Sequence, residues 1–264
     1  MDLNGSVFIV TGSATGVGSA TVKQLSERGA NVVINYTRSR GEAEETAAAC
    51  QAAGAEVALV QADVAEDAAC RALVQAAIER WGRLDGLVNN AAVTIKSDPF
   101  DLETLSAADF QKVFSVNVVG TYQMCRAALP HLRDSRGAIV NVSSHVAFTG
   151  GGSSLAYTSS KGAVNALTLA LARTFAPEVR VNAVCPGVID TRWMRNAMGD
   201  AYDAFAARQS EMTPLGRVAT AEDVADAIVW LLGGAGFITG ELLGIDGGFR
   251  LMGGVRKPAP RGTR

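Results

Sequence analysis

A tyrosine and a lysine stand four residues apart near Leu155, where a helical pattern of apolar residues begins. On a helix this spacing places Tyr157 and Lys161 on the same face. A free tyrosine ionises near pH ~10, and a fixed cation beside it favours the phenolate. We therefore expect Lys161 to lower the pKa of Tyr157 and to make this residue a usable proton shuttle.

A serine precedes this pair at the end of an apolar run. Ser144 follows residues 138–142, whose composition is typical of a buried parallel strand. Ligands of open α/β sheets bind at the carboxyl ends of the strands. Ser144 is therefore expected to lie where a substrate carbonyl would be held. With Tyr157 and Lys161 it forms a candidate catalytic set, and His145 is a candidate residue of the substrate pocket.

A glycine-rich turn connects the first apolar run, residues 6–11, to a helical pattern over residues 17–28. Glycines at such a turn let the backbone approach a pyrophosphate, which then lies at the positive end of the helix. Its place directly after the first strand favours a dinucleotide-binding turn. The candidate contacts are Gly12, Ser13, Thr15, Gly16, Val17 and Gly18.

The residues after the second expected strand, residues 31–35, bear on the choice of cofactor. Folds that prefer NAD place an acidic residue there, which accepts a hydrogen bond from the ribose 2′-hydroxyl. This chain has Tyr36 instead, followed by Arg38, Ser39 and Arg40. The sequence therefore predicts NADP(H) rather than NAD(H), with Tyr36, Arg38 and Ser39 at the cofactor and Arg40 in support.

Strands and helices alternate along the rest of the chain. Further strands are expected at residues 56–61, 84–88, 138–142, 179–185 and 242–246, and helices at residues 42–53, 66–81, 107–133, 154–175 and 221–232. This order predicts an α/β fold, a single doubly wound parallel sheet of about seven strands flanked by helices. We expect one domain over residues 1–254 and a basic, solvated tail over residues 255–264.

A polar and aromatic segment at about residues 190–212 interrupts this alternation. Long excursions at such a position usually carry function, so it is interpreted as a mobile lid over the substrate. Trp193 and Met194 are its candidate substrate contacts.

Composition excludes several other classes of protein. The 264 residues are 48% hydrophobic and carry a net charge of −2, which suits one large soluble domain and provides no basic field for nucleic acid. No window is long and apolar enough to span a membrane, and the first residues are unlike a signal peptide. Four scattered cysteines indicate free thiols, and the two histidines predict no metal site. We expect a cytoplasmic protein.

These motifs occur together and in a particular order. They are the glycine turn, Asn89-Asn90-Ala91-Ala92, Asn117, Ser144, Tyr157 with Lys161, and Pro186-Gly187. In this the chain resembles the short-chain dehydrogenase/reductase family, in its subgroup of about 250 residues that includes the 3-oxoacyl-[acyl-carrier-protein] reductases. The resemblance extends to about Gly254 and implies a Rossmann fold with Ser144, Tyr157 and Lys161 as catalytic residues.

The resemblance implies further roles. Asp63 and Val64 would border the adenine ring, although Asp63 could also cap the helix from about residue 66. Lys161 would also contact the nicotinamide ribose, and Asn117 would hold a water that links Lys161 to solvent; as an alternative, Asn117 is an ordinary hydrogen-bonded core residue. The remaining cofactor contacts implied are Asn90, Ala91, Pro186, Gly187, Ile189 and Thr191.

The expected activity is reversible hydride transfer between a ketone and a secondary alcohol. A 3-oxoacyl thioester, a sugar or polyol, and a steroid-like alcohol remain open as substrates, the last two with NAD(H). A non-catalytic NADP(H) sensor is a further alternative, and so is an epimerase or dehydratase. The helices expected at residues 107–133 and 154–175 are apolar around most of their circumference, which indicates a homodimer. The resemblance implies that a homotetramer is common.

Overall fold

Seven parallel strands form the central sheet of the protein, in the order β3-β2-β1-β4-β5-β6-β7. A computed structural model describes residues 1–251, apart from the side chains of Trp193 and Ala197. The strands are β1 Val7–Val10, β2 Asn31–Tyr36, β3 Val57–Gln61, β4 Gly86–Asn89, β5 Ala138–Val142, β6 Arg180–Pro186 and β7 Leu242–Ile245. The expected doubly wound sheet of about seven strands is confirmed.

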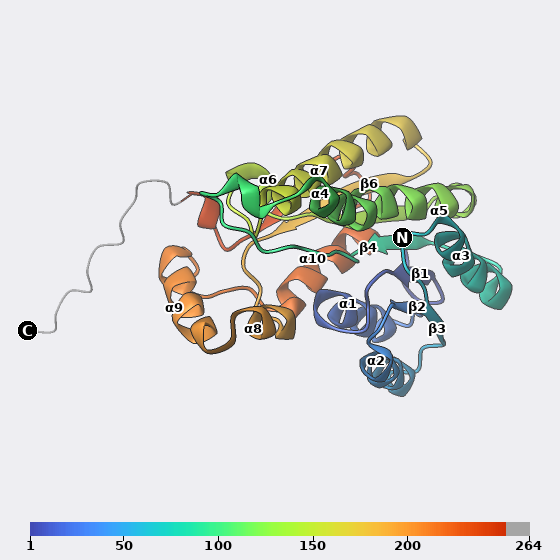
Figure 1. Cartoon of the computed structure of the whole chain (residues 1–264). Helices are drawn as coiled ribbons and strands as arrows, with labels where there is room; N and C mark the ends of the chain where they lie inside the picture. Colours follow the sequence, from blue (N-terminus) through green and yellow to red (C-terminus); the bar gives the residue numbers. More distant parts are fainter. Residues whose placement is uncertain (252–264) are drawn as a thin grey trace, which may run out of the picture.

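Helices cover both faces of this sheet (Figure 1). The helices are α1 Gly16–Ser26, α2 Arg40–Ala52, α3 Asp67–Trp81, α4 Ala107–Phe114, α5 Thr121–Ser135, α6 Val146–Thr149, α7 Leu155–Phe175, α8 Arg192–Met198, α9 Tyr202–Met212 and α10 Ala221–Gly233. Short helical turns are η1 Leu102–Thr104, the π-helical η2 Ser115–Gly120, η3 Gly199–Ala201 and η4 Phe249–Leu251. The four-residue helix α6 was not expected from the sequence.

Two hydrophobic cores separate the helix layers from the sheet. One core lies under α1, α2 and α10, and includes the fully buried Phe8 and Ile228. The other lies under α3, α5 and α7, and includes Ile9 and Leu132. Phe8 and Ile9 are adjacent in β1 and point to opposite faces, as the two-residue period of a strand requires. The strands are almost continuously apolar because both faces are covered.

The direction in which successive strands are added to the sheet reverses between β1 and β4. From β1 the chain first adds β2 and β3 on one side, and then crosses over to add β4 to β7 on the other. In such sheets ligands bind at the carboxyl ends of the strands, next to the switch point. The segments that follow β1, β2, β4, β5 and β6 therefore meet at one edge. Within residues 1–251, no helix combines the length and the apolar character needed to cross a membrane.

Candidate active site

Helix α7 presents Tyr157 and Lys161 at its first turns. Ser154 caps this helix, and its hydroxyl accepts a hydrogen bond from Tyr157 N at 3.1 Å. Lys161 is 3% exposed, and its ammonium donates to Val142 O, at the end of β5, at 2.8 Å. The Lys161 Nζ atom lies 5.6 Å from the centre of the Tyr157 ring. The two side chains therefore share one face of α7, as their spacing predicted.

Ser144 lies opposite Tyr157 at the end of β5. Its side chain is hydrogen-bonded to that of Tyr157, and its hydroxyl also accepts from Val146 N at 3.3 Å, in the first turn of α6. Ser144 is 8% exposed. The structure thus brings Ser144, Tyr157 and Lys161 together at the carboxyl edge of the sheet. A serine hydroxyl and a phenol that face each other can hold one carbonyl oxygen between them.

The electrostatics of the pair differ from the sequence expectation. Burial raises the pKa of Tyr157 to about 12, and the hydrogen bond to Ser144 offsets this only in part. Burial lowers the pKa of Lys161 to about 8. The ammonium donates to a backbone carbonyl below the ring, so its proximity does not outweigh the desolvation of the phenol. At neutral pH Tyr157 keeps its proton, which is the form that can protonate an alkoxide.

Asn117 lies in the π-helical turn η2 between α4 and α5. Its side-chain oxygen accepts from Val93 N at 2.8 Å, and its amide nitrogen donates to Val93 O and to Ser160 Oγ, both at 3.0 Å. The local loosening of the helix that the resemblance implied is present. Asn117 thereby connects the loop after β4 to α7, beside Lys161. Its role in holding a relay water stays a prediction.

The glycine turn adopts a conformation that suits a dinucleotide. Gly12 and Gly16 have φ of +61° and +57°, where side chains are disfavoured. A Cβ on Gly18 would lie 2.6 Å from Gly12 O, so α1 packs directly on the turn. A Cβ on Gly16 would find only Thr191 within 4 Å, at 3.7 Å, which leaves room for a ligand above the start of α1. These residues fit a pyrophosphate at this helix terminus.

Other polar groups of the turn are used internally. Ser13 is fully buried, and its hydroxyl donates to Val10 O. Asn35 Oδ1 accepts from Gly12 N at 2.9 Å, and Asn35 Nδ2 donates to Ala62 O. Thr15 caps α1 without a side-chain capping bond, and Gly16 and Val17 form its first turn. The internal bonds of Ser13 shape the turn, whereas contacts of Thr15, Gly16 and Val17 with a cofactor stay a prediction.

The loop after β2 carries the residues predicted to select the cofactor. Tyr36 is buried, Arg38 is exposed, and Ser39 caps α2 without a side-chain hydrogen bond. Arg40 Nε instead pairs with Glu44 at 2.8 Å, one turn along α2. Arg38 has no ion pair among residues 1–251, and its contact with a 2′-phosphate stays a prediction. The predicted supporting role of Arg40 would require it to leave Glu44.

The residues after β3 and β4 lie at the same edge of the sheet as the glycine turn, where the resemblance implies contacts with the adenine ring and the rest of the cofactor. Asp63 is exposed and accepts from Ala65 N at 3.0 Å, while Val64 is buried. Helix α3 begins after Glu66, so the alternative that Asp63 is its N-cap is wrong. Asn90 Nδ2 donates to Thr11 O at 2.9 Å and to Gly12 O at 3.0 Å. Asn90 therefore positions the glycine turn. A cofactor contact of Ala91, the next residue, stays a prediction.

The segment after β6 runs from Pro186 to the lid. A Cβ on Gly187 would lie 3.1 Å from Asp246 Cα, so a larger residue there would push against the backbone that follows β7. Ile189 forms a bridge with Ala219, and Thr191 caps α8 by accepting from Met194 N at 3.3 Å. Contacts of Ile189 and Thr191 with the nicotinamide stay a prediction. Met194 is partly buried on α8, and the side chain of Trp193 falls outside the described part of the chain.

His145 lies beside Ser144 and stacks on Phe249 of η4, with ring centres 5.4 Å apart. Burial lowers the pKa of His145, so the neutral imidazole prevails at physiological pH. Its Nδ1 is buried and has no hydrogen-bond partner among residues 1–251. The sequence did not indicate a role for Phe249, because contacts between residues so far apart in the chain leave no local pattern. Nor did it single out Asn35, whose signal was only its polar place at the end of a buried strand.

The chain is similar to known proteins over almost its whole length. A sequence model of the family described as Enoyl-(Acyl carrier protein) reductase matches residues 12–250. A protein of Streptomyces violaceoruber, named as a candidate ketoacyl reductase of the granaticin polyketide synthase, is 42% identical over 93% of this chain and 96% of its own. The 3beta-hydroxysteroid dehydrogenase 1 of Eggerthella lenta is 37% identical over 97% of each chain. The solved short-chain dehydrogenase/reductase of Serratia marcescens BCRC 10948 is 34% identical, with a TM-score of 0.85 over 94% of this chain and 99% of its own.

Proposed function

Because the chain belongs to the short-chain dehydrogenase/reductase family, whose members are oxidoreductases acting on CH-OH groups, we propose that it interconverts a ketone and a secondary alcohol with NADP(H). The observation that carries this proposal is the hydrogen bond between Ser144 and Tyr157, with Lys161 buried on the same face of α7. A non-catalytic sensor of NADP(H) would have no use for this arrangement.

In the reducing direction the protein positions the carbonyl and supplies a proton. Ser144 and Tyr157 donate hydrogen bonds to the carbonyl oxygen, and Tyr157 then transfers its phenolic proton to the developing alkoxide. Lys161 stabilises the resulting phenolate. The nicotinamide supplies the hydride when bound, held by Pro186, Gly187, Ile189 and Thr191. Asn117 positions α7 and completes the route by which Lys161 exchanges protons with solvent.

The substrate class is proposed from the relatives. A 3-oxoacyl thioester is the first candidate, because the relative from Streptomyces violaceoruber is named as a ketoacyl reductase. The hydroxysteroid dehydrogenase relative favours a cyclic or steroid-like alcohol as the second. Residues 190–212 act as the lid over either substrate, and four buried free thiols support a cytoplasmic location.

A cofactor-coupled screen tests this function. The protein is mixed with NADPH or NADH and with β-ketoacyl thioesters, sugars and cyclic ketones, and the absorbance of the reduced cofactor is followed. We expect consumption of NADPH with at least one carbonyl class. Binding of the cofactor without turnover of any of them would favour the sensor.

The cofactor preference gives a first prediction. Arg38→Ala removes the cation proposed to contact the 2′-phosphate, and a charge-assisted hydrogen bond is worth roughly 1.5–3 kcal/mol. We therefore expect the Kd for NADPH to rise about tenfold or more while the Kd for NADH stays unchanged. Fluorescence titration measures both constants. Arg40→Ala is the control and should have a smaller effect, because Arg40 is paired with Glu44. Equal or tighter binding of NADH by the unaltered protein would refute the NADP(H) assignment.

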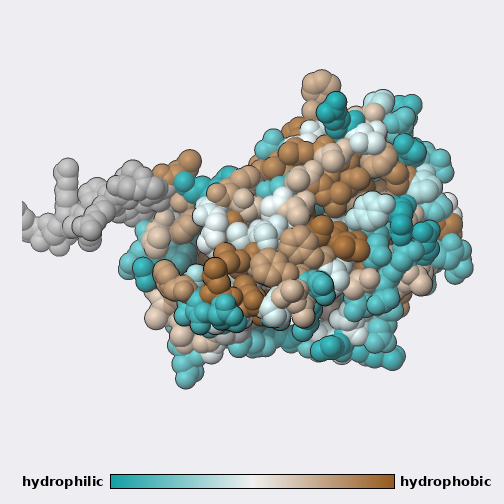
Figure 2. All heavy atoms as spheres, turned by 45° about the horizontal axis from the view of Figure 1, so that its top comes forward, coloured by the Kyte–Doolittle hydropathy of each residue, from teal (hydrophilic) through white to brown (hydrophobic). Residues whose placement is uncertain are grey.

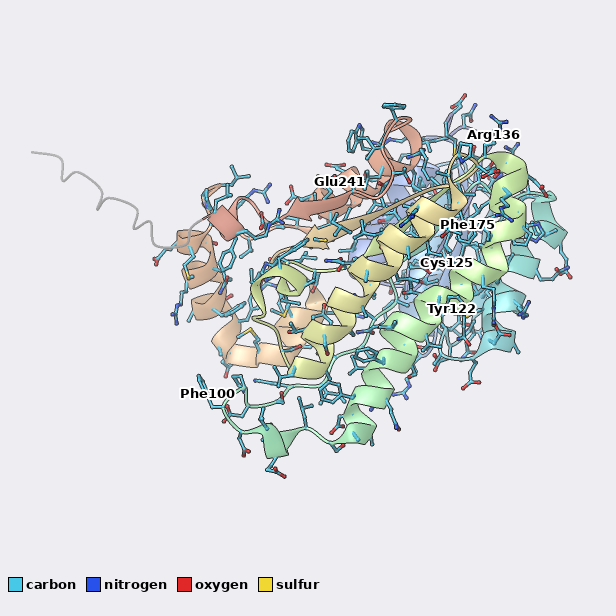
Figure 3. The ribbon with its side chains drawn as sticks, turned by 90° about the horizontal axis from the view of Figure 1, so that it is seen from above. Phe100, Tyr122, Cys125, Arg136, Phe175 and Glu241 are labelled. Carbon is cyan, nitrogen blue, oxygen red and sulfur yellow. The ribbon has the colours of Figure 1, made fainter. Side chains whose placement is uncertain are left out.

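Self-association gives a second prediction. Helix α7 lies beside the helix formed by α4, η2 and α5, and large apolar side chains of this layer are exposed (Figure 3). Figure 2, which turns this layer towards the viewer, shows hydrophobic residues gathered there. The exposed members are Val119, Tyr122, Leu155 and Leu169. An apolar face of this kind supports a homodimer or homotetramer.

Replacing Leu169 by Asp should therefore shift the protein to a smaller species. Leu169 is 48% exposed on α7, and a charge there would be buried without a partner in the assembly. Light scattering after size-exclusion chromatography at micromolar concentration measures the mass. Leu102→Asp is the control, since Leu102 is exposed on η1 outside this layer. A monomeric unaltered protein would refute the association.

A further inference from the structure

An ion pair joins two helices on opposite sides of the proposed cofactor groove. Arg192, the first residue of α8, places its Nη2 2.8 Å from Glu42 Oε1 in the first turn of α2. Helix α8 begins the lid after β6, and α2 follows the loop that carries Arg38. The two residues are 150 positions apart in the chain, so no local pattern accounts for their meeting.

The chain between β6 and α8 crosses the start of α1 to reach this pair. Thr191, directly before Arg192, lies 3.7 Å from the position of a Cβ on Gly16, the first residue of α1. Figure 1 shows α8 beside α1, and α2 below α1. A dinucleotide that runs from Arg38 to Pro186 must pass the start of α1. Arg192 and Glu42 are therefore placed to cover the outer side of the path proposed for the dinucleotide.

Contacts of Arg195 also hold helix α8 in place. Arg195 binds both carboxylate oxygens of Asp190, at 2.8 and 2.7 Å, and its guanidinium lies 4.4 Å from the centre of the Tyr202 ring on α9. These contacts attach α8 to its own base and to the rest of the lid. The bond from Arg192 to Glu42 attaches the start of the lid to α2, in the half of the sheet that contains β2 and β3. Breaking it should free the lid start without disturbing its internal structure.

We infer that Glu42 and Arg192 form a bridge that holds the start of the lid over the central part of the bound dinucleotide and slows its release. This inference rests on the proposed function, because it takes the cofactor path from it. Neither residue touches the reacting atoms, so both are positioning residues. Both side chains are partly exposed, at 34% and 55%, and exposed ion pairs change rate constants by roughly 1.5- to 5-fold.

The test is the dissociation rate of NADPH from the full-length protein, measured by stopped-flow displacement with excess NADP⁺. Glu42→Gln keeps the shape of the side chain and removes its charge. We expect cofactor release to become about 2- to 5-fold faster, with the association rate constant nearly unchanged. Glu56→Gln is the matched control: it breaks an exposed ion pair with Arg80 directly before β3, at the opposite edge of the sheet, and release should not change.

A charge exchange provides the rescue. The double variant Glu42→Arg with Arg192→Glu restores the pair in reverse and should return the release rate to within about twofold of the unaltered value. Thermal unfolding of the cofactor-free variants should match that of Glu56→Gln, which separates the bridge from a general loss of stability.

Other results would overturn the bridge. If Glu42→Gln and Glu56→Gln release NADPH equally fast, the pair is a surface contact without function. If Glu42→Gln instead slows release, Arg192 leaves Glu42 to neutralise the cofactor phosphates, and the carboxylate competes with the ligand. Failure of the unaltered protein to bind either NADPH or NADH would overturn the proposed function itself, which is a different outcome from normal binding with equal release rates.

Discussion

Replacing Tyr157 by Phe should reduce kcat by roughly 10²–10⁴-fold, because the variant loses the acid that protonates the alkoxide. The phenol is hydrogen-bonded to Ser144 and has a pKa of about 12, so it carries its proton throughout the physiological range. Phe fills the same space, and the Kd for NADPH should stay within about twofold of its value in the unaltered protein. Steady-state kinetics with a carbonyl substrate from the screen and cofactor titration measure the two effects.

Tyr122→Phe is the control for this substitution. Tyr122 lies on α5 and is 45% exposed, and its ring packs against the guanidinium of Arg126, outside the set formed by Ser144, Tyr157 and Lys161. The same chemical change there should leave kcat unchanged. A Tyr157→Phe variant with nearly normal kcat would remove Tyr157 from the proton transfer and leave Ser144 or a bound water as the acid.

The sequence predicted the sheet well because each strand has its own local signal. Runs such as residues 138–142 are apolar and short, and helical patterns alternate with them. The ends of elements were harder to predict: the alternative that Asp63 caps a helix proved wrong, since α3 begins after Glu66. Helix α6, directly after Ser144, was missed because four residues are too few to show a period.

The candidate site was predictable where its residues are close in sequence or follow a strand. Tyr157 and Lys161 share a helix face by spacing alone, and Ser144 reaches them because the carboxyl ends of parallel strands share an edge. The pKa of Tyr157 was not predictable, because it depends on burial and on where the ammonium points. Spacing places Lys161 near the ring, but only the fold shows that Val142 O holds it.

Contacts between residues far apart in the chain could not be predicted from the sequence, for a related reason. The stack of His145 on Phe249 and the pair of Glu42 with Arg192 depend on how the lid and the end of the chain return to the sheet. No local sequence pattern indicates where the chain folds back onto the sheet. The features that modify the active site are therefore less visible in the sequence than the catalytic residues.

Replacing Lys161 by Met should abolish most activity and at the same time stabilise the cofactor-free protein at pH 7. Lys161 is almost fully buried, and burial lowers its pKa to about 8, from 10.5. The unfolded chain thus holds this proton more tightly than the folded protein does. The cost of burying the charge is fully present below pH 8 and disappears as the pH rises towards 10.5.

Met has a similar length and no charge, so the variant avoids this cost. The expected gain in unfolding free energy at pH 7 is roughly 1–3 kcal/mol after the loss of the hydrogen bond to Val142 O is allowed for. Urea unfolding at pH 7 and at pH 9.5 measures it, and the advantage of the variant should shrink at the higher pH. Lys112→Met, at an exposed lysine on α4, is the control and should change stability little at either pH.

The two effects of Lys161→Met have one physical cause. A cation under the Tyr157 ring is useful only when the phenol gives up its proton, and it has to be buried to act there. The same desolvation that makes Lys161 costly for folding strengthens its interaction with a phenolate. A variant that is less stable than the unaltered protein at pH 7, or that keeps the same advantage at pH 9.5, would show that Lys161 carries no buried charge. The account of its role in proton transfer would then be wrong.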